Sequence, residues 1–227
     1  MVKIFLITLV IFALVQPSYS GTITGTFLFT KSPPDAAVVY IRDMNAPSHV
    51  AEIDQKGIQF TKKFDVSSTG TDVIFTNSDP VKHNLFANSY KTDTKFDVGL
   101  IPPNKAVEIP VQWPEDTLIR IGCKIHRNMR TYIANIKSEK YTIVDFVRKS
   151  RWKSKKGFKS YSETKRANKA DKYDFKLLDV PDDTKSVTIM LPHTDLIEVE
   201  LELSEEKEVI ISRRGKQLGT LKLMLNK

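Results

Sequence analysis

A short loop between two apolar segments constrains this chain more than any other feature, because it holds the only cysteine. The loop covers residues 122–129 and has the sequence Gly-Cys-Lys-Ile-His-Arg-Asn-Met. A tight connection between two strands can turn Cys123, His126 and Met129 toward one point. His83 lies far upstream, so it must arrive from the end of a neighbouring strand. The rest of the chain is therefore expected to include a scaffold that brings these two segments together.

The four side chains form a known set of metal ligands. A thiolate, two imidazoles and a thioether are the donors of a blue-copper site, where the soft thiolate suits copper and the weak axial donor tunes its potential. We therefore interpret Cys123, His83 and His126 as equatorial ligands and Met129 as the axial ligand. Three of these residues also have an ordinary explanation: Cys123 as a small buried hydrophobe, His83 as a turn residue and Met129 as core filler.

Other chemistries of cysteine and histidine fit this pattern less well. Structural zinc sites use thiolates and imidazoles and have little use for a thioether. A Cys-His hydrolase needs a base beside its nucleophile, and a three-residue spacing at a strand end is poor geometry for that. A binuclear copper site needs a second cysteine, and a copper oxidase needs more than the four histidines present. The pattern favours an electron carrier over an enzyme.

Short apolar segments separated by turn residues predict an all-β fold. The expected strands are residues 22–29, 37–41, 59–66, 72–77, 106–111, 117–121, 131–136, 173–178, 186–191, 196–203, 208–212 and 218–225. Short strands at this spacing are typical of a β-sandwich or barrel. No segment of residues 21–136 has a helical pattern.

The first twenty residues are typical of a secretory signal peptide. Lys3 precedes an apolar run from Ile4 to Val15, and small residues stand at Ser18 and Ser20. The run is shorter than the ~20 residues that span a bilayer. We therefore expect cleavage after Ser20, a secreted or periplasmic protein, and no transmembrane anchor after cleavage.

Composition divides the remaining chain into three parts. Residues 21–137 are expected to form the copper-binding β-sandwich, residues 138–172 a basic linker, and residues 173–227 a smaller β-sandwich-like domain. Between residues 148 and 172, eleven Lys or Arg stand against two acidic residues. In an exported protein this run is more typical of a solvated linker than of an arm that binds nucleic acid or anionic lipid. His193, which follows Pro192, is interpreted as a surface turn residue.

The motifs of residues 59–137 resemble those of the cupredoxin family, above all amicyanin, whose ligand loop has the same short Cys-x-x-His-x-x-Met form. They are also similar to the plastocyanin-like domains of exported bacterial proteins labelled methylamine-utilisation-like. Those domains have a His-Asn near an Asp-Pro, a Phe-Asp-x-Gly-Leu segment and a Gly-Cys-x-Ile-His-x-x-Met loop. This chain has the three motifs at residues 79–84, 96–100 and 122–129.

The resemblance implies a Greek-key β-sandwich that holds one type 1 copper ion and carries single electrons. The ligands that it carries over are His83, Cys123, His126 and Met129. It implies that Asn84 hydrogen-bonds the His83 loop to the cysteine loop and so fixes the orientation of the ligands. It also implies that His126 is the ligand nearest the solvent, where electrons enter and leave.

The ligand loop is more basic than the family pattern. Arg127 stands where an acidic residue is expected, and Asn128 where an aromatic residue is expected. Together with the net charge of +8, the basic residues beside the ligands predict a redox partner with an acidic docking patch. These residues are Lys82, Lys124, Arg127 and Arg130. Two alternatives to electron transfer stay open: a protein that stores or delivers copper, and a structural interaction module with a vestigial site.

Overall fold

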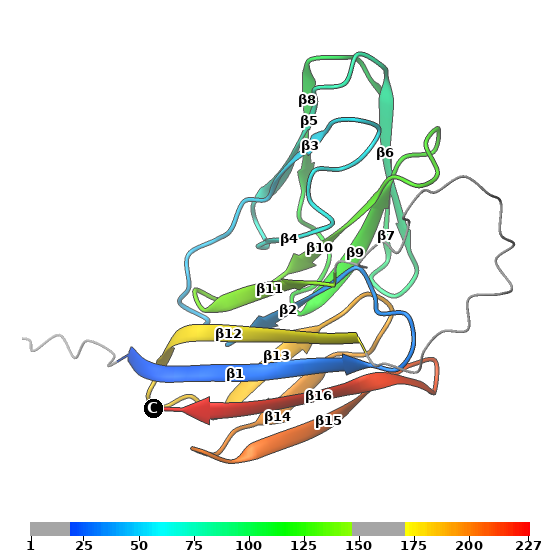
Figure 1. The fold of residues 1–227 in the computed structure, drawn as a ribbon. Coiled ribbons are helices and arrows are strands. Elements are labelled where there is room, and N and C mark those ends of the chain that lie inside the picture. The colour runs from blue at the N-terminus through cyan, green and yellow to red at the C-terminus, as the bar shows by residue number, and fades with distance from the viewer. Residues whose placement is uncertain (1–18, 147–170) are drawn as a thin grey trace, which may run out of the picture.

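The structure is a computed structural model that describes residues 19–146 and 171–227. Over these residues the chain forms sixteen β-strands and no helix (Figure 1), which confirms the expected all-β class. The described residues accordingly include no apolar helix of membrane-spanning length. Most of the expected signal peptide and most of the expected linker lie outside the described residues.

Eight strands form the half of the molecule that carries the predicted metal ligands. They make one sheet in the order β4-β10-β9-β6-β7 and a second in the order β3-β5-β8. Their bounds are β3 Glu52–Gln55, β4 Phe64–Ser67, β5 Asp72–Asn77, β6 His83–Ser89, β7 Thr94–Ile101, β8 Lys105–Pro110, β9 Thr117–Gly122 and β10 Arg130–Asn135. Because alternate residues of a strand face the same side, both sheets contribute to one apolar core, which includes Phe75, Leu85 and Ile121.

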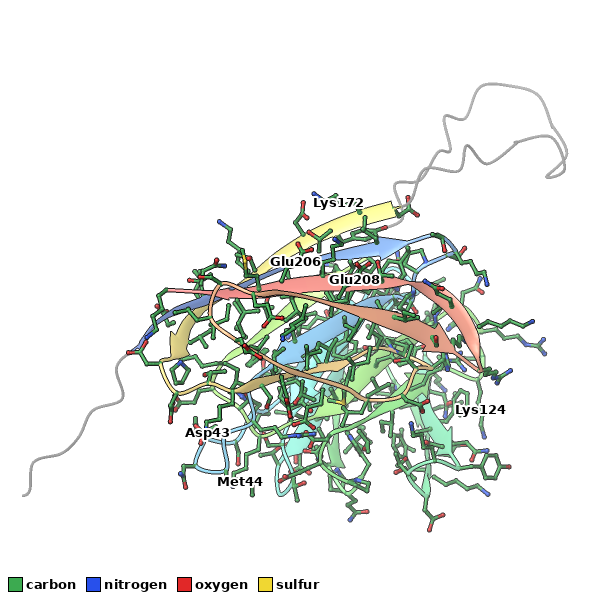
Figure 2. The ribbon with its side chains drawn as sticks, turned by 90° about the horizontal axis from the view of Figure 1, so that it is seen from below. Asp43, Met44, Lys124, Lys172, Glu206 and Glu208 are labelled. Carbon is green, nitrogen blue, oxygen red and sulfur yellow. The ribbon has the colours of Figure 1, made fainter. Side chains whose placement is uncertain are left out.

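The other eight strands form a second sandwich below the first in Figure 1. Its sheets have the orders β12-β1-β16-β15 and β11-β2-β13-β14. The bounds are β1 Tyr19–Phe29, β2 Ala36–Tyr40, β11 Tyr141–Asp145, β12 Asp171–Pro181, β13 Ser186–Met190, β14 Ile197–Glu200, β15 Glu206–Arg213 and β16 Lys216–Asn226. Figure 2 shows the outer sheet, with Lys172 on β12 and Glu206 and Glu208 on β15. The core includes Phe27, Ile189 and Leu221.

Strand β2 connects the two sandwiches because both of its faces are buried. Ala37 and Val39 belong to the core of the second sandwich. Ala36, Val38 and Tyr40 face the other way and pack in a separate cluster with residues of β4, β10 and β13. This interface cluster makes the two sandwiches share apolar surface, so the loss of water from that surface stabilises both.

Polar contacts reinforce the same interface. The Tyr40 hydroxyl donates a hydrogen bond to Asp116, which lies in the loop before β9. Arg42 donates to Asp116 at 2.7 Å and to Glu198 of β14 at 2.8 Å. Burial, followed by the neighbouring Asp116 carboxylate, raises the pKa of Tyr40. The phenol therefore stays protonated and remains a donor at neutral pH.

The sheet pairings correct the expected domain boundaries. Residues 21–41 were expected in the copper domain, but β1 lies between β12 and β16, where Thr24 is opposite both Lys176 and Met224. The C-terminal strands therefore do not form a unit by themselves. Residues 141–145, expected in the linker, form β11 and pair with β2. Alternation of apolar residues indicates that a segment is a strand, but it does not indicate the partner of that strand.

Four strands, β3, β6, β7 and β11, were absent from the strands expected from the sequence, and the reason is clear for β3 and β11. Strand β3 was assigned to a loop because Glu52–Gln55 has only one strongly apolar residue, Ile53. Its parallel pairing with β5 stabilises it instead. Strand β11 was missed because a strongly basic segment follows it, so the whole region was assigned to a linker. Tertiary pairing decides strand formation in both cases, since β-propensity depends strongly on context.

Candidate metal centre

The loop with the cysteine connects two paired strands, and its shape is fixed by its own backbone. Arg130 at the start of β10 is opposite Gly122 at the end of β9. The Cys123 N–H donates to the Met129 carbonyl at 3.3 Å, and the Met129 N–H donates to the His126 carbonyl at 2.9 Å. A Cβ at Gly122 would lie 3.1 Å from the Phe86 ring. Glycine therefore lets β9 approach β6 at the point where the loop begins.

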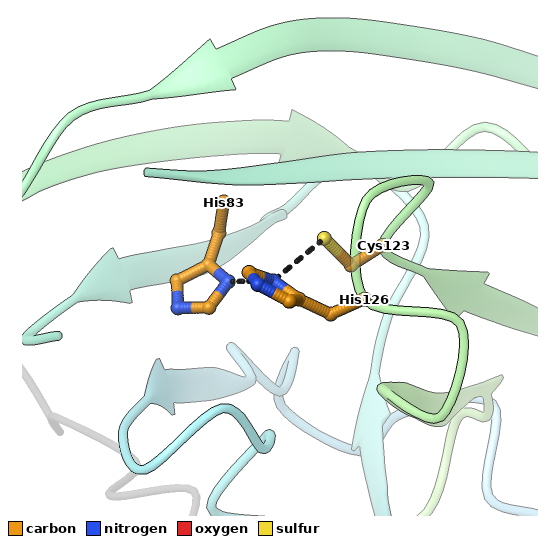
Figure 3. A group of neighbouring side chains, drawn as sticks. All are labelled: His83, Cys123 and His126. Carbon is orange, nitrogen blue, oxygen red and sulfur yellow. Dashed lines mark hydrogen bonds between the residues drawn. The ribbon is translucent and has the colours of Figure 1, made fainter. Parts of the chain in front are cut away.

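Three of the predicted ligand side chains converge at this loop (Figure 3). Nδ1 of His83 lies 3.0 Å from Nδ1 of His126, which in turn lies 3.7 Å from Sγ of Cys123. All three donor atoms lie within 4.8 Å of one another. His83 is fully buried and Cys123 is 2% exposed, whereas His126 is half-buried. The site thus has two buried ligand candidates and one imidazole at its outer side.

Asp79 sets which nitrogen of His83 faces the cluster. Its Oδ2 lies 2.7 Å from Nε2 of His83. A carboxylate accepts hydrogen bonds, so Nε2 carries the proton and Nδ1 presents its lone pair to His126 and Cys123. This tautomer leaves Nδ1 of His83 available to bind a metal ion.

The Asp79 carboxylate is itself held by backbone donors. The N–H groups of Gly57 and Ile58 donate to it at 2.6 and 2.9 Å. Burial raises the pKa of Asp79, but the hydrogen bonds from Ile58, His83 and Gly57 outweigh burial and lower it overall. The carboxyl group is therefore ionised at neutral pH and available to orient His83. The sequence prediction missed Asp79; its position four residues before His83 was the available signal.

Asn84 ties three segments together beside the sulfur. Its backbone N–H donates to Sγ of Cys123 at 3.4 Å. Its side-chain oxygen accepts from the Lys124 N–H at 3.2 Å, and its side-chain nitrogen donates to Asp97 and to the Gly99 carbonyl. These contacts have the form that the sequence resemblance implied for Asn84. A donor to the sulfur stabilises a thiolate and tunes a metal bound to it.

Met129 is buried in the same apolar core cluster as Cys123, with 1% of its surface exposed. That cluster also includes Leu85 and Ile121, from the strands that carry the ligand segments. The thioether side chain therefore belongs to the apolar wall around the cysteine. Its role as an axial ligand remains a proposal.

The four basic residues expected to dock a partner have different surroundings. Lys124 is exposed (Figure 2) and forms an ion pair with Asp97. This ion pair, together with hydrogen bonds from Gly99 and Asn84, lowers the pKa of Asp97 to about 2. Arg130 pairs with Asp35 at 2.9 Å and lines a separate cavity. Among the described residues, Lys82 and Arg127 are exposed and form no ion pair. The unpaired positive charge beside the cluster is therefore at Lys82 and Arg127.

The donor set fits a copper ion by the atoms that it presents. Bonds of about 2.0–2.3 Å from nitrogen and sulfur place two ligands of one metal ion no more than about 4.6 Å apart. The His83–His126 and His126–Cys123 separations of 3.0 and 3.7 Å lie within this limit, and all three donor atoms lie within 4.8 Å of one another. Two imidazoles and one thiolate in a trigonal arrangement are the typical ligands of blue copper. His83, Cys123 and His126 are therefore suited to hold copper.

Comparison with known proteins gives partial structural matches. No protein-family model and no curated protein matches the chain. A purple cupredoxin from Nitrosopumilus maritimus is 17% identical, with 37% of this chain and 98% of that chain covered and a TM-score of 0.32. Amicyanin from Paracoccus versutus is 15% identical, with 42% and 90% covered and a TM-score of 0.34.

A third match is to a larger copper protein. The Cu-containing nitrite reductase from Thermus scotoductus SA-01 is 16% identical, with 41% of this chain and 24% of that chain covered and a TM-score of 0.34. At these identities and scores the matches describe a partial likeness to cupredoxin structures. The assignment of a metal centre therefore depends on the geometry of this chain's own residues.

Proposed function

We propose that this chain is an exported type 1 copper protein that carries single electrons between redox partners. The observation that supports this most directly is the convergence of Nδ1 of His83, Nδ1 of His126 and Sγ of Cys123 in a mostly buried cluster. Met129 packs in the same apolar cluster as Cys123 and is the proposed fourth ligand. A copper ion held there would supply one-electron redox chemistry.

The residues around the cluster would favour electron transfer over chemistry on a substrate. His83, Cys123 and Met129 are buried, so water has no direct path to those three donors. Asp79 and Asn84 fix the directions of His83 and Cys123 through hydrogen bonds. A rigid donor set changes little when a metal changes its charge, because its ligands are already oriented.

His126 would be the port through which electrons pass. It is the only half-exposed member of the cluster. Several apolar residues that are close to the ligand segments in the sequence are exposed. Leu100 is 56% exposed and Ile125 is 52% exposed, and Pro102 is also exposed. Lys82 and Arg127 add unpaired positive charge. An acidic partner would therefore dock here weakly, through a small apolar contact with a basic rim.

The first experiment is a titration of the full chain with Cu(II), followed by visible absorption, for the wild type and for Cys123→Ser. We expect an intense blue thiolate-to-copper band that saturates at one equivalent and is absent in the variant. Circular dichroism checks that both chains are folded. No band in a folded wild-type chain would indicate a vestigial site and would overturn the proposal.

A second measurement separates electron transfer from copper delivery. We expect the copper-loaded chain to be oxidised and reduced repeatedly without loss of metal. Rapid transfer of Cu(I) to a soluble chelator at each cycle would instead indicate a protein that stores or delivers copper.

The docking proposal is tested with hexacyanoferrate, an anionic electron acceptor. The rate should fall as salt is added, because salt screens exposed charges. Lys82→Gln with Arg127→Gln should lower the low-salt rate, whereas Lys172→Gln on the outer sheet should not. A rate that is independent of salt would contradict the basic docking face.

A further inference from the structure

A polar cavity lies between the two sandwiches and is separate from the ligand cluster. Its volume is about 230 Å³, and its lining includes Arg120, Arg130, Tyr132, His193 and Arg213. The residues come from β9 and β10 of the first sandwich and from β15 and the loop before β14 of the second. The cavity therefore exists only because the two sandwiches are packed together.

The cavity has an excess of positive charge. Arg130 is matched by Asp35, which also lines the cavity and accepts two hydrogen bonds from it at 2.9 and 3.1 Å. Arg120 and Arg213 form no ion pair within the described residues, as the pairs found there involve other cations. Among the described residues that line the cavity, one carboxylate stands against three guanidinium groups, and Arg120 and Arg213 are exposed. Two positive charges of this lining therefore remain for a ligand to balance.

Two further polar groups face one another in the cavity. The Tyr132 hydroxyl lies 3.1 Å from Nε2 of His193, and their rings meet edge to face. Burial, and then the positive charges of Arg213, Arg120 and Arg214, lower the pKa of His193 against a weaker opposing effect of Asp35. The positive φ of 68° at His193 is uncommon for a residue with a side chain. His193 is exposed and lies in a turn, as the sequence predicted, and it also lines the cavity.

We propose that this cavity binds a small oxyanion with two negative charges, such as a phosphate group or a dicarboxylate. Guanidinium groups match the planar geometry of carboxylate and phosphate oxygens and bind them through paired hydrogen bonds. The cavity is smaller than the roughly 300–1,000 Å³ of sites for drug-sized ligands, which favours a compact ion. Tyr132 and His193 supply neutral hydrogen-bonding groups beside the arginines.

The position of the cavity also connects it to the ligand loop. Arg130 follows Met129 directly in the chain, and Arg120 is opposite Tyr132 in the β9-β10 pairing. A bound anion would contact both sandwiches and stabilise the folded chain, since a ligand that binds only the folded state raises its stability. This inference concerns the metal-free protein and does not depend on the proposed copper function.

The test is calorimetric titration of the full, metal-free chain at low salt with inorganic phosphate, succinate and sulfate. We expect at least one dianion to bind with a 1:1 stoichiometry and to raise the melting temperature, and monovalent acetate to bind at least tenfold more weakly. Tighter binding of phosphate would indicate a site for phosphate groups, and tighter binding of succinate a site for dicarboxylates.

Arg213→Gln should weaken that binding at least tenfold, because it removes a guanidinium that lines the cavity. Arg214→Gln is the matched control: it removes the same charge from the next residue, which does not line the cavity, and should change affinity less than about threefold. Equal losses in the two folded variants would indicate attraction by general positive charge and would overturn the site. Failure of all three dianions to bind the wild type would overturn it as well.

Discussion

Oδ2 of Asp79 lies 2.7 Å from Nε2 of His83, and both side chains are buried. The same carboxylate accepts the backbone N–H groups of Gly57 and Ile58. One carboxylate therefore joins the loop after β3 to His83 of the ligand cluster. The negative charge and the fixed position of the Asp79 carboxylate together orient the His83 ring so that Nδ1 faces the cluster.

Asp79→Asn should lower the affinity for Cu(II) by about 10- to 100-fold, the usual cost of losing a group that orients a metal-ligating histidine. The amide keeps the volume of the side chain but can also donate to Nε2, which permits the wrong tautomer of His83. Competition with a chelator of known affinity measures the change. Asp65→Asn is the control, since Asp65 bonds to Lys62 and to the Val66 N–H. Equal affinities for wild type and Asp79→Asn would show that the contact does not orient the ligand.

Met129→Leu should raise the reduction potential of the bound copper and leave the blue band in place. Loss of a weak thioether donor destabilises Cu(II) more than Cu(I), whereas the thiolate that gives the band is unchanged. Cyclic voltammetry measures the potential. Met44→Leu is the control because Met44 is 68% exposed. An unchanged potential in Met129→Leu would indicate that Met129 is core filler alone.

The Asp97 carboxylate should make stability depend on acid. Lys124, with Gly99 and Asn84, lowers its folded-state pKa to about 2, below the value of about 3.9 in an unfolded chain. The stabilisation of the folded state by ionised Asp97 is therefore fully present above about pH 4 and is lost as the pH falls toward 2.

Melting temperatures of the metal-free chain test this directly. At pH 6 the wild type should have a higher melting temperature than Asp97→Asn. The difference in melting temperature should be small, as expected for an exposed pair, and should decrease as the pH falls toward 2. Asp195→Asn removes the same charge from a fully exposed side chain and separates the local effect from that of net charge. A gap that stays constant across this range would contradict the local pairing.

Ile136→Ala should destabilise both sandwiches together. Ile136 is fully buried in the interface cluster with Val38 and Tyr40, and truncation of a buried isoleucine costs about 2–5 kcal/mol. Calorimetry should give one transition that moves to a lower temperature. The control Ile210→Ala changes a side chain that is 63% exposed and should alter the free energy of unfolding by about 0.5 kcal/mol or less. Two separate transitions, only one of which moves, would show that the sandwiches unfold independently.

The sequence was sufficient for the fold class and for the residues that converge at the ligand loop. Apolar alternation predicted β5 with its observed bounds, Asp72–Asn77, and the three-residue spacing of Cys123 and His126 predicted their meeting. These features are local, so they can be inferred from neighbouring residues. His83 was placed through its motif.

The remaining features depend on contacts between distant segments. Nothing near Arg130 in the sequence indicates that Asp35 neutralises it, so Arg130 was expected on the docking face. Nothing in residues 22–29 indicates that β1 pairs with β12 and β16. Such pairings are decided by which apolar faces bury one another, and the local pattern of residues in one sequence does not reveal that choice.

The placement of β1 between β12 and β16 has a consequence for how this protein is made. Thr22 is opposite Asn226, so the outer sheet cannot close until β16, Lys216–Asn226, has been synthesised. Pairing of segments so distant raises the contact order of the fold and slows folding. Slow closure of this sheet would keep its strands unpaired for longer, which is the state that the proposed export of the chain requires.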